Sequence, residues 1–117
     1  HSIRRRQRQM CIRDRIEGYQ SAIAIDAEYV DAYYNLGALY YNQSITLKSV
    51  AGDYSGEKYD SEMARADEML KKAIPSLEKV LKLAPSDKST LRVLKSLYFN
   101  LDDMDNYSRV KKQLEAL

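Results

Sequence analysis

Cysteine and histidine are almost absent from this chain, and tryptophan is missing altogether. The 117 residues contain one cysteine, Cys11, and one histidine, His1. An internal disulfide is therefore impossible, and the Cys/His ligand set of a structural zinc site is missing. We expect no metal site and no cofactor.

Glycine, proline and long apolar runs are also scarce. The four glycines and two prolines interrupt the chain at few places, and this composition favours a helix-rich protein. No run of roughly 18 apolar residues occurs, so no membrane-spanning helix is expected. We make no prediction of the cellular compartment, because the sequence starts at His1 and a true N-terminus is expected to be missing.

The net charge of +2 has a local origin. Residues 1–15 hold six arginines and one acid, whereas residues 16–117 hold thirteen basic and sixteen acidic side chains. The basic character of the chain therefore comes from its first fifteen residues, and the rest has an excess of negative charge.

The arginine-rich segment has three possible interpretations. It could be an arm that binds nucleic acid or an anionic membrane, or a solvated extension of the first helix. Alternatively, residues 5–15, RRQRQMCIRDR, resemble one reading frame of an oligonucleotide adapter used to prepare sequencing libraries. We favour the adapter, and so expect residues 1–15 to be non-native and the chain to enter a repeat partway through. Neither nucleic acid nor membrane is expected as a partner.

The remaining chain resembles itself at one fixed offset of 58 residues. Residues 36, 39, 40, 41 and 42 match residues 94, 97, 98, 99 and 100 in size and polarity. A constant offset is typical of repeat architectures, and 58 residues equal one 34-residue repeat plus an insertion of 24. Apolar residues within each copy recur at i, i+3 and i+4, which predicts helices.

Five helices are expected, at about residues 12–25, 29–50, 57–83, 88–100 and 104–116. Breaks between them are predicted at residues 51–56, at Pro85-Ser86-Asp87 and at residues 101–103. The second and third helices are long, so we expect an antiparallel hairpin that projects beyond its neighbours. Its projecting part is predicted to be held together by Ile45, Leu47, Val50, Met63, Ala66, Met69 and Leu70.

The segment AYYNLGALYY at residues 32–41 resembles the first helix of a tetratricopeptide repeat (TPR). The family pattern has an aromatic residue, then Leu-Gly three residues later, then Tyr, as at Tyr33, Leu36-Gly37 and Tyr40. The resemblance implies an all-α fold in which antiparallel hairpins stack as a short α-solenoid. Within a domain of residues 16–117, we expect a partial repeat at 16–29, an extended repeat at 30–87, and a C-terminal repeat or cap at 88–117.

The resemblance also implies a function. In this family the first helix of each repeat lines a concave groove that holds a peptide or protein. Tyr33 and Tyr40 are predicted to pack inside the hairpin, whereas Tyr34 and Tyr41 could face either the interior or the groove. The lysine and asparagine that bind acidic chaperone tails in some members are replaced by Tyr34 and Ala38, so that activity is not expected. The predicted groove residues are Asp31, Tyr34, Ala38, Tyr41, Asn42, Ser89, Arg92, Ser96, Phe99 and Asn100.

An enzyme is not expected, because no nucleophile–base pair or metal cluster occurs outside the first fifteen residues. The acids Asp102, Asp103 and Asp105 precede or begin a helix, where carboxylates cap free N–H groups. The sequence therefore favours a non-catalytic scaffold that binds a peptide or protein. The alternative is a purely structural or self-associating module, paired through the projecting hairpin.

Overall fold

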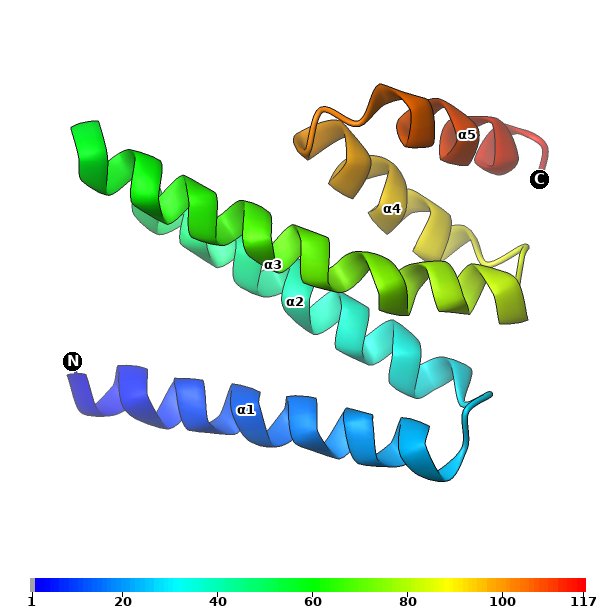
Figure 1. The fold of residues 1–117 in the computed structure, drawn as a ribbon, viewed down its shortest axis with the longest axis horizontal. Coiled ribbons are helices and arrows are strands. Elements are labelled where there is room, and N and C mark those ends of the chain that lie inside the picture. Colours follow the sequence, from blue (N-terminus) through cyan, green and yellow to red (C-terminus); the bar gives the residue numbers. More distant parts are fainter. Residues whose placement is uncertain (1) are drawn as a thin grey trace.

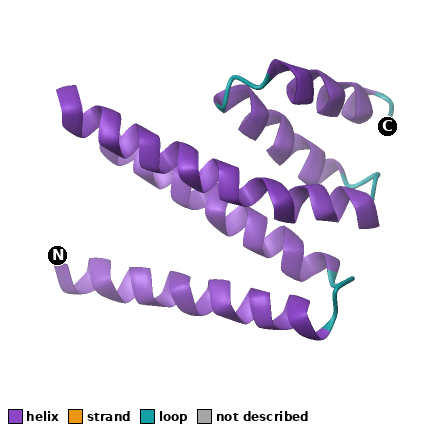
Figure 2. Ribbon diagram, in the orientation of Figure 1, coloured by secondary structure: helices purple, strands orange, loops and turns teal. Residues whose placement is uncertain are grey.

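The computed structural model describes the backbone of residues 2–117 and the side chains of residues 11–117. The described chain is all-α, with helices joined by short turns (Figure 2). In order, the helices are α1 (Ser2–Ile25), α2 (Val30–Ala51), α3 (Gly56–Leu83), α4 (Lys88–Asn100) and α5 (Met104–Glu115). The predicted fold class is confirmed.

Four of the five helices begin and end within one residue of their predicted bounds. The exception is the first helix, which was expected to begin near residue 12 and instead begins at Ser2. Residues 2–12 contain neither proline nor glycine, so no residue there interrupts a helix. The side chains of residues 1–10 and the whole of His1 lie outside the described residues, and the non-native origin of residues 1–15 stays a prediction.

Successive helices run antiparallel, and α2 and α3 form the central hairpin (Figure 1). α1 packs on α2, while α4 packs on α3 and on α5. The turn between α2 and α3 lies far from α4 and α5, and only α1 runs alongside on the same side (Figure 1). The hairpin thus projects beyond α4 and α5, as the lengths of the two helices predicted.

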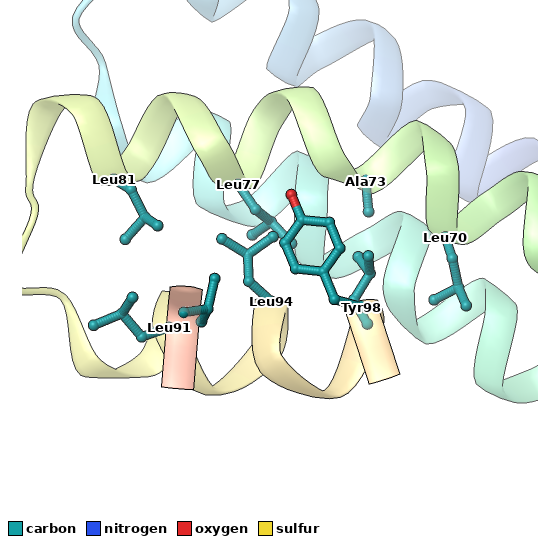
Figure 3. Packing of buried hydrophobic residues seen from close by; sticks show 9 residues of the cluster. Leu70, Ala73, Leu77, Leu81, Leu91, Leu94 and Tyr98 are labelled. Atoms are coloured by element: carbon teal, nitrogen blue, oxygen red, sulfur yellow. The ribbon is translucent and has the colours of Figure 1, made fainter. Parts of the chain in front are cut away.

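The main core lies between α3, α4 and α5. It contains Leu70, Ala73, Leu77, Leu81, Leu91, Leu94, Leu97, Tyr98 and Val110, all buried (Figure 3). The leucines of α3 and α4 interdigitate, and the Tyr98 ring points towards α3 (Figure 3). Each fully buried leucine contributes about 1.5–3 kcal/mol of transfer free energy, so this cluster dominates the stability of the fold.

A close approach of two helices sets the geometry of the hairpin. A Cβ added at Gly37 of α2 would lie 2.6 Å from Cγ of Leu77 in α3. No real side chain tolerates such a distance, and Leu77 is fully buried and cannot swing away. Glycine at this position therefore allows α2 and α3 to touch, as expected for the Leu-Gly pair of the repeat.

In the projecting part of the hairpin, small residues contribute to the contact between α2 and α3 as much as large ones do. Ala51, Ala66 and Leu70 are buried there, and Leu47, Val50, Met63 and Met69 are partly buried. Ile45 was predicted to join this seam, but its side chain is 50% exposed. The prediction for Ile45 is wrong, because this position of α2 faces away from α3.

Candidate functional site

α2 and α4 are the first helices of their hairpins, and they contact each other directly. Along α2, Tyr34, Tyr41 and Lys48 recur every seven residues and so share one face of the helix. The Lys48 ammonium donates a hydrogen bond to Oδ1 of Asn100, at the end of α4, across 3.3 Å. This bond joins α2 to α4, the two helices that carry the predicted groove residues.

The two tyrosines of this face have a structural role. Tyr34 and Tyr41 are partly buried and pack against the main core, as Tyr40 also does. Each therefore helps to hold α2 against the α3–α4 layer while leaving part of its ring accessible. The sequence left both orientations open. Both rings pack against the core, and their part in a groove stays a prediction.

Phe99 differs from the tyrosines in its exposure and its neighbour. Its side chain is 60% exposed, and its ring lies 5.7 Å from that of Tyr107 in α5, centroid to centroid. It therefore stands on the α5 side of α4. A ligand that follows the line between α2 and α4 would meet Phe99 only at its margin.

The polar residues of the predicted groove are accessible. Asp31, Asn42, Ser89, Arg92 and Ser96 are exposed, and Ala38 is partly buried. The amide nitrogen of Asn100 donates to the carbonyl oxygen of Ser96 at 2.8 Å. Because its nitrogen is held in this way, the Asn100 oxygen is directed at Lys48. Binding by these residues stays a prediction.

Two residues of this face, Lys48 and Ile45, were not among the predicted groove positions. Lys48 lies seven residues after Tyr41, and Ile45 lies four after it, so helical spacing alone could have placed them beside the tyrosine. They were missed because residues 43–51 extend α2 beyond an ordinary repeat. The groove positions carried over from the family end before this extension.

The helices α2 and α4 carry more positive than negative charge. α2 and α4 together carry Lys48, Lys88, Arg92 and Lys95 against a single acid, Asp31. Residues 16–117 as a whole have an excess of acids. The two helices therefore differ in the sign of their net charge from residues 16–117 as a whole.

A hollow of about 320 Å³ lies between α1 and α2. Of the predicted groove residues, only Asp31 borders it. The hollow is open and shallow because small residues, Gly18 and Ala22 of α1 and Ala32 of α2, face each other across it. Tyr19, Tyr29 and Asn35 complete its walls together with Arg15.

A buried tyrosine is the one strongly perturbed ionisable group among the described side chains. Burial, followed by the hydrogen bond to Glu78, raises the pKa of Tyr98 well above its usual range. The Tyr98 hydroxyl donates to Oε1 of Glu78 at 2.7 Å, and Arg109 of α5 pairs with the same oxygen. The three groups join α3, α4 and α5, and the raised pKa keeps the Tyr98 hydroxyl protonated and makes it a weaker proton donor.

Caps at the helix starts account for other acidic residues. The carboxylate of Asp87 accepts from the backbone N–H groups of Ser89 and Thr90 at 3.1 and 3.4 Å. The carboxylate of Asp103 accepts from the N–H of Asn106 at 3.3 Å. Of the three acids predicted to lie at the start of α5, Asp103 forms the cap bond. Among residues 11–117, no three His, Cys, Asp or Glu side chains are grouped as a metal site would require.

Comparison with known proteins connects this geometry to a family. Residues 16–44, from the second half of α1 through most of α2, match the family model of the TPR repeat. No curated protein matches the chain significantly. None of the described helices combines the length and the apolar composition needed to cross a membrane.

Proposed function

Because residues 16–44 match the TPR repeat and the chain is all-α, we propose that it binds a peptide or protein partner along the concave side of α2 and α4. TPR repeats are generally protein-interaction modules, and the family is generally non-catalytic. The observation that supports the proposal most is the pairing of α2 and α4 through Lys48 and Asn100. It brings the two first helices together with their polar residues accessible.

The accessible surface on this side suits recognition of a chain more than of a small molecule. Exposed Asn42, Arg92 and Ser96 offer hydrogen-bond donors and acceptors. The rings of Tyr34 and Tyr41 pack against the core and are partly accessible. Aromatic and arginine side chains contribute most to protein interfaces, since they give large contact area at low cost in entropy. The division into an extended repeat at residues 30–87 and a C-terminal repeat or cap at residues 88–117 is part of the same proposal.

A displayed random-peptide library would test the proposal. The protein would be used for selection, and the variant Ala38→Gln/Arg92→Ala/Ser96→Gln for counter-selection. Peptides that bind the protein and lose about tenfold or more in affinity for the variant would support binding on this face. A control variant, Ser108→Gln/Lys111→Ala, changes exposed residues of α5 and should bind them normally.

Two results would count against the proposal. Selected peptides could bind both proteins equally, or only peptides sensitive to the α5 control could emerge. In either case the surface between α2 and α4 is not the binding site.

Self-association through the hairpin is the second candidate function, because aromatic side chains are exposed at its turn. Tyr54 and Tyr59 are 36% and 40% exposed, and the Lys58 ammonium lies 4.1 Å from the centre of the Tyr54 ring. Sedimentation equilibrium of the protein and of a Tyr54→Ser/Tyr59→Ser variant would test this candidate. A concentration-dependent dimer that the variant lacks would support pairing, whereas a monomer at all concentrations would exclude it.

A further inference from the structure

Charge is distributed unevenly between the two ends of α3. Residues 53–68, in the turn and the projecting half of the helix, hold six acidic and two basic side chains. Residues 71–95, in the other half of α3 and the first part of α4, hold two acidic and seven basic ones. The two segments therefore carry net charges of −4 and +5, and the molecule has an acidic end and a basic end.

Three acids of the projecting half lie on one face of α3. Asp60 is three residues after Glu57 and seven before Asp67, so the three share a helix face, with Ala64 between them. Glu57, Asp60 and Ala64 are exposed, and Asp67 is partly buried. None of the three carboxylates forms an ion pair with a side chain of residues 11–117. These three acids form the acidic stripe.

A row of basic residues lies on one face of α4. Lys88, Arg92, Lys95 and Phe99 follow one another at intervals of four, three and four residues, so they share this face. The Phe99 ring is next to that of Tyr107, which places the face on the α5 side of α4. Lys88 and Arg92 are exposed and Lys95 is partly buried, and none forms an ion pair with a described acid. The three cations form the basic stripe.

The fold holds the two stripes apart. α4 packs antiparallel on α3, so Lys88 lies beside the C-terminal end of α3. Asp60 lies in the projecting part of the hairpin, which extends beyond α4 and α5 (Figure 1). Opposite charges that lie at two ends of one molecule are available to a second copy, which they attract and orient.

The two stripes also match in length. Asp60 and Asp67 are seven residues apart, as are Lys88 and Lys95, and seven residues span about 10.5 Å of helix. Two carboxylates can therefore meet two ammonium groups when the helices of two copies lie side by side. Exposed ion pairs contribute at most about 1 kcal/mol each. The Phe99 side chain, 60% exposed at the end of the basic stripe, adds an apolar contact.

We propose that copies of this protein associate head to tail, with the acidic stripe of α3 in one copy against the basic stripe of α4 in the next. The proposal rests on the self-association candidate and gives it a geometry. Each copy uses two different surfaces in this contact, so association produces a chain of copies or a closed ring rather than a twofold dimer. Because the contact is charged, it weakens as salt screens the attraction.

Two variants that each neutralise one stripe test the proposal. Asp60→Asn/Asp67→Asn changes the acidic stripe, and Lys88→Gln/Lys95→Gln changes the basic stripe. In sedimentation velocity at low ionic strength, the wild type should form species that grow with concentration and return to monomer in about 0.5 M sodium chloride. Each variant alone should associate at least tenfold more weakly than wild type, because one side of the contact is lost.

An equimolar mixture of the two variants separates the possible geometries. The acidic-stripe variant keeps its basic stripe, and the basic-stripe variant keeps its acidic stripe. One intact contact remains between them, so the mixture should form a heterodimer and no larger species. Pairing of two hairpin turns through Tyr54 and Tyr59 predicts a different result, since the basic-stripe variant would then associate by itself as fully as wild type.

Control variants make the same changes of charge at other places. Lys72→Gln/Lys112→Gln removes two exposed lysines of α3 and α5, and Asp105→Asn/Glu115→Gln removes two exposed acids of α5. Both controls should associate like wild type. A melting temperature within a few degrees of wild type would show that each variant is folded.

Three results would overturn the head-to-tail proposal. A wild-type monomer at all concentrations would exclude it together with self-association through the hairpin. Loss of association in the tyrosine variant of the hairpin turn, but in neither stripe variant, would keep that candidate and reject the head-to-tail contact. Association that the basic-stripe variant retains and Arg4→Gln/Arg5→Gln/Arg8→Gln loses would assign the acidic stripe to the arginine-rich segment instead.

Discussion

α1 and α4 occupy corresponding places on either side of the central hairpin, yet they are held by different amounts of buried surface. α4 has 13 residues, of which Thr90, Leu91, Leu94, Leu97 and Tyr98 are buried. In α1, none of the described side chains, those of residues 11–25, is fully buried. α4 therefore belongs to the main core, whereas α1 lies on α2 through half-buried contacts beside an open hollow.

The difference shows where the stability of a repeat array originates. A single hairpin cannot bury its apolar face, so each helix depends on the neighbour stacked against it. α4 has such neighbours on both sides, in α3 and α5. α1 packs on α2 alone among the described helices. We expect α4 to unfold with the whole domain, and α1 to open at lower free energy.

The largest expected effect is the removal of a leucine from the α4 core. Leu94 is fully buried, so Leu94→Ala should cost about 2–5 kcal/mol of unfolding free energy through lost burial and a residual cavity. Ile23→Ala in α1 removes a half-buried side chain and should cost about 1 kcal/mol. Urea unfolding followed by circular dichroism would measure both. Equal losses at the two positions would contradict the inferred difference between α1 and α4.

Substitution of two glycines by alanine gives the next largest effects on stability, and the two effects have opposite signs. Gly37→Ala places a Cβ against buried Leu77 and should cost about 1–3 kcal/mol by overpacking. Gly18 of α1 has no atom within 4 Å of an added Cβ, so Gly18→Ala should stabilise the helix by up to about 1 kcal/mol. Thermal melting should therefore move down for Gly37→Ala and up for Gly18→Ala. A rise for both would mean that Leu77 can yield to the added methyl group.

Local signals explain why the helix bounds could be predicted so closely from the sequence. Pro85 and Asp87 mark the end of one helix and the cap of the next, and both act within a few residues of their own position. The Leu36-Gly37 pair predicted a close helix approach because only a small residue permits one. These properties belong to short segments, so the pattern of residue types was enough.

Properties that depend on distant segments were not predictable in the same way. Ile45 has the hydrophobicity of a seam residue, but Gly37 and buried Ser44 are on the side of α2 that faces α3, and Ile45 faces outwards. The Lys48–Asn100 bond joins residues 52 positions apart, and no local sequence pattern predicts it. The orientation of Phe99 towards Tyr107 likewise depends on how α5 packs against α4.

Helix capping offers a smaller test of the same two sides of the molecule. The N-cap residue of α4 is Asp87, whose side chain accepts hydrogen bonds from the first turn. The N-cap residue of α2 is Tyr29, which forms no such bond. Asp87→Ala should cost about 1 kcal/mol, because two N–H groups lose their acceptor. Tyr29→Asp should lose no such bond and could gain one. Chemical unfolding of both variants would show destabilisation for Asp87→Ala alone, and a loss of similar size for Tyr29→Asp would be unexpected.

The smallest expected effect concerns the hydroxyl that joins α4 to α3. Tyr98→Phe removes the bond to Glu78 but leaves Arg109 paired with the carboxylate, so the loss near neutral pH should be about 0.5–1.5 kcal/mol. Burial and Glu78 raise the pKa of Tyr98 in the folded state above the value of about 10 for an unfolded chain. The neutral hydroxyl therefore stabilises the fold fully below pH 10, and this stability is lost as the pH rises above it.

Unfolding free energies of wild type and Tyr98→Phe between pH 8 and pH 11 would measure this contribution. The wild type should lose stability more steeply above pH 10 than the variant, so that the two curves converge. Tyr107→Phe removes one tyrosine whose hydroxyl is not bonded to Glu78, and it serves as the matched control. Parallel curves for wild type and Tyr98→Phe would show that the hydroxyl contributes nothing to the alkaline loss.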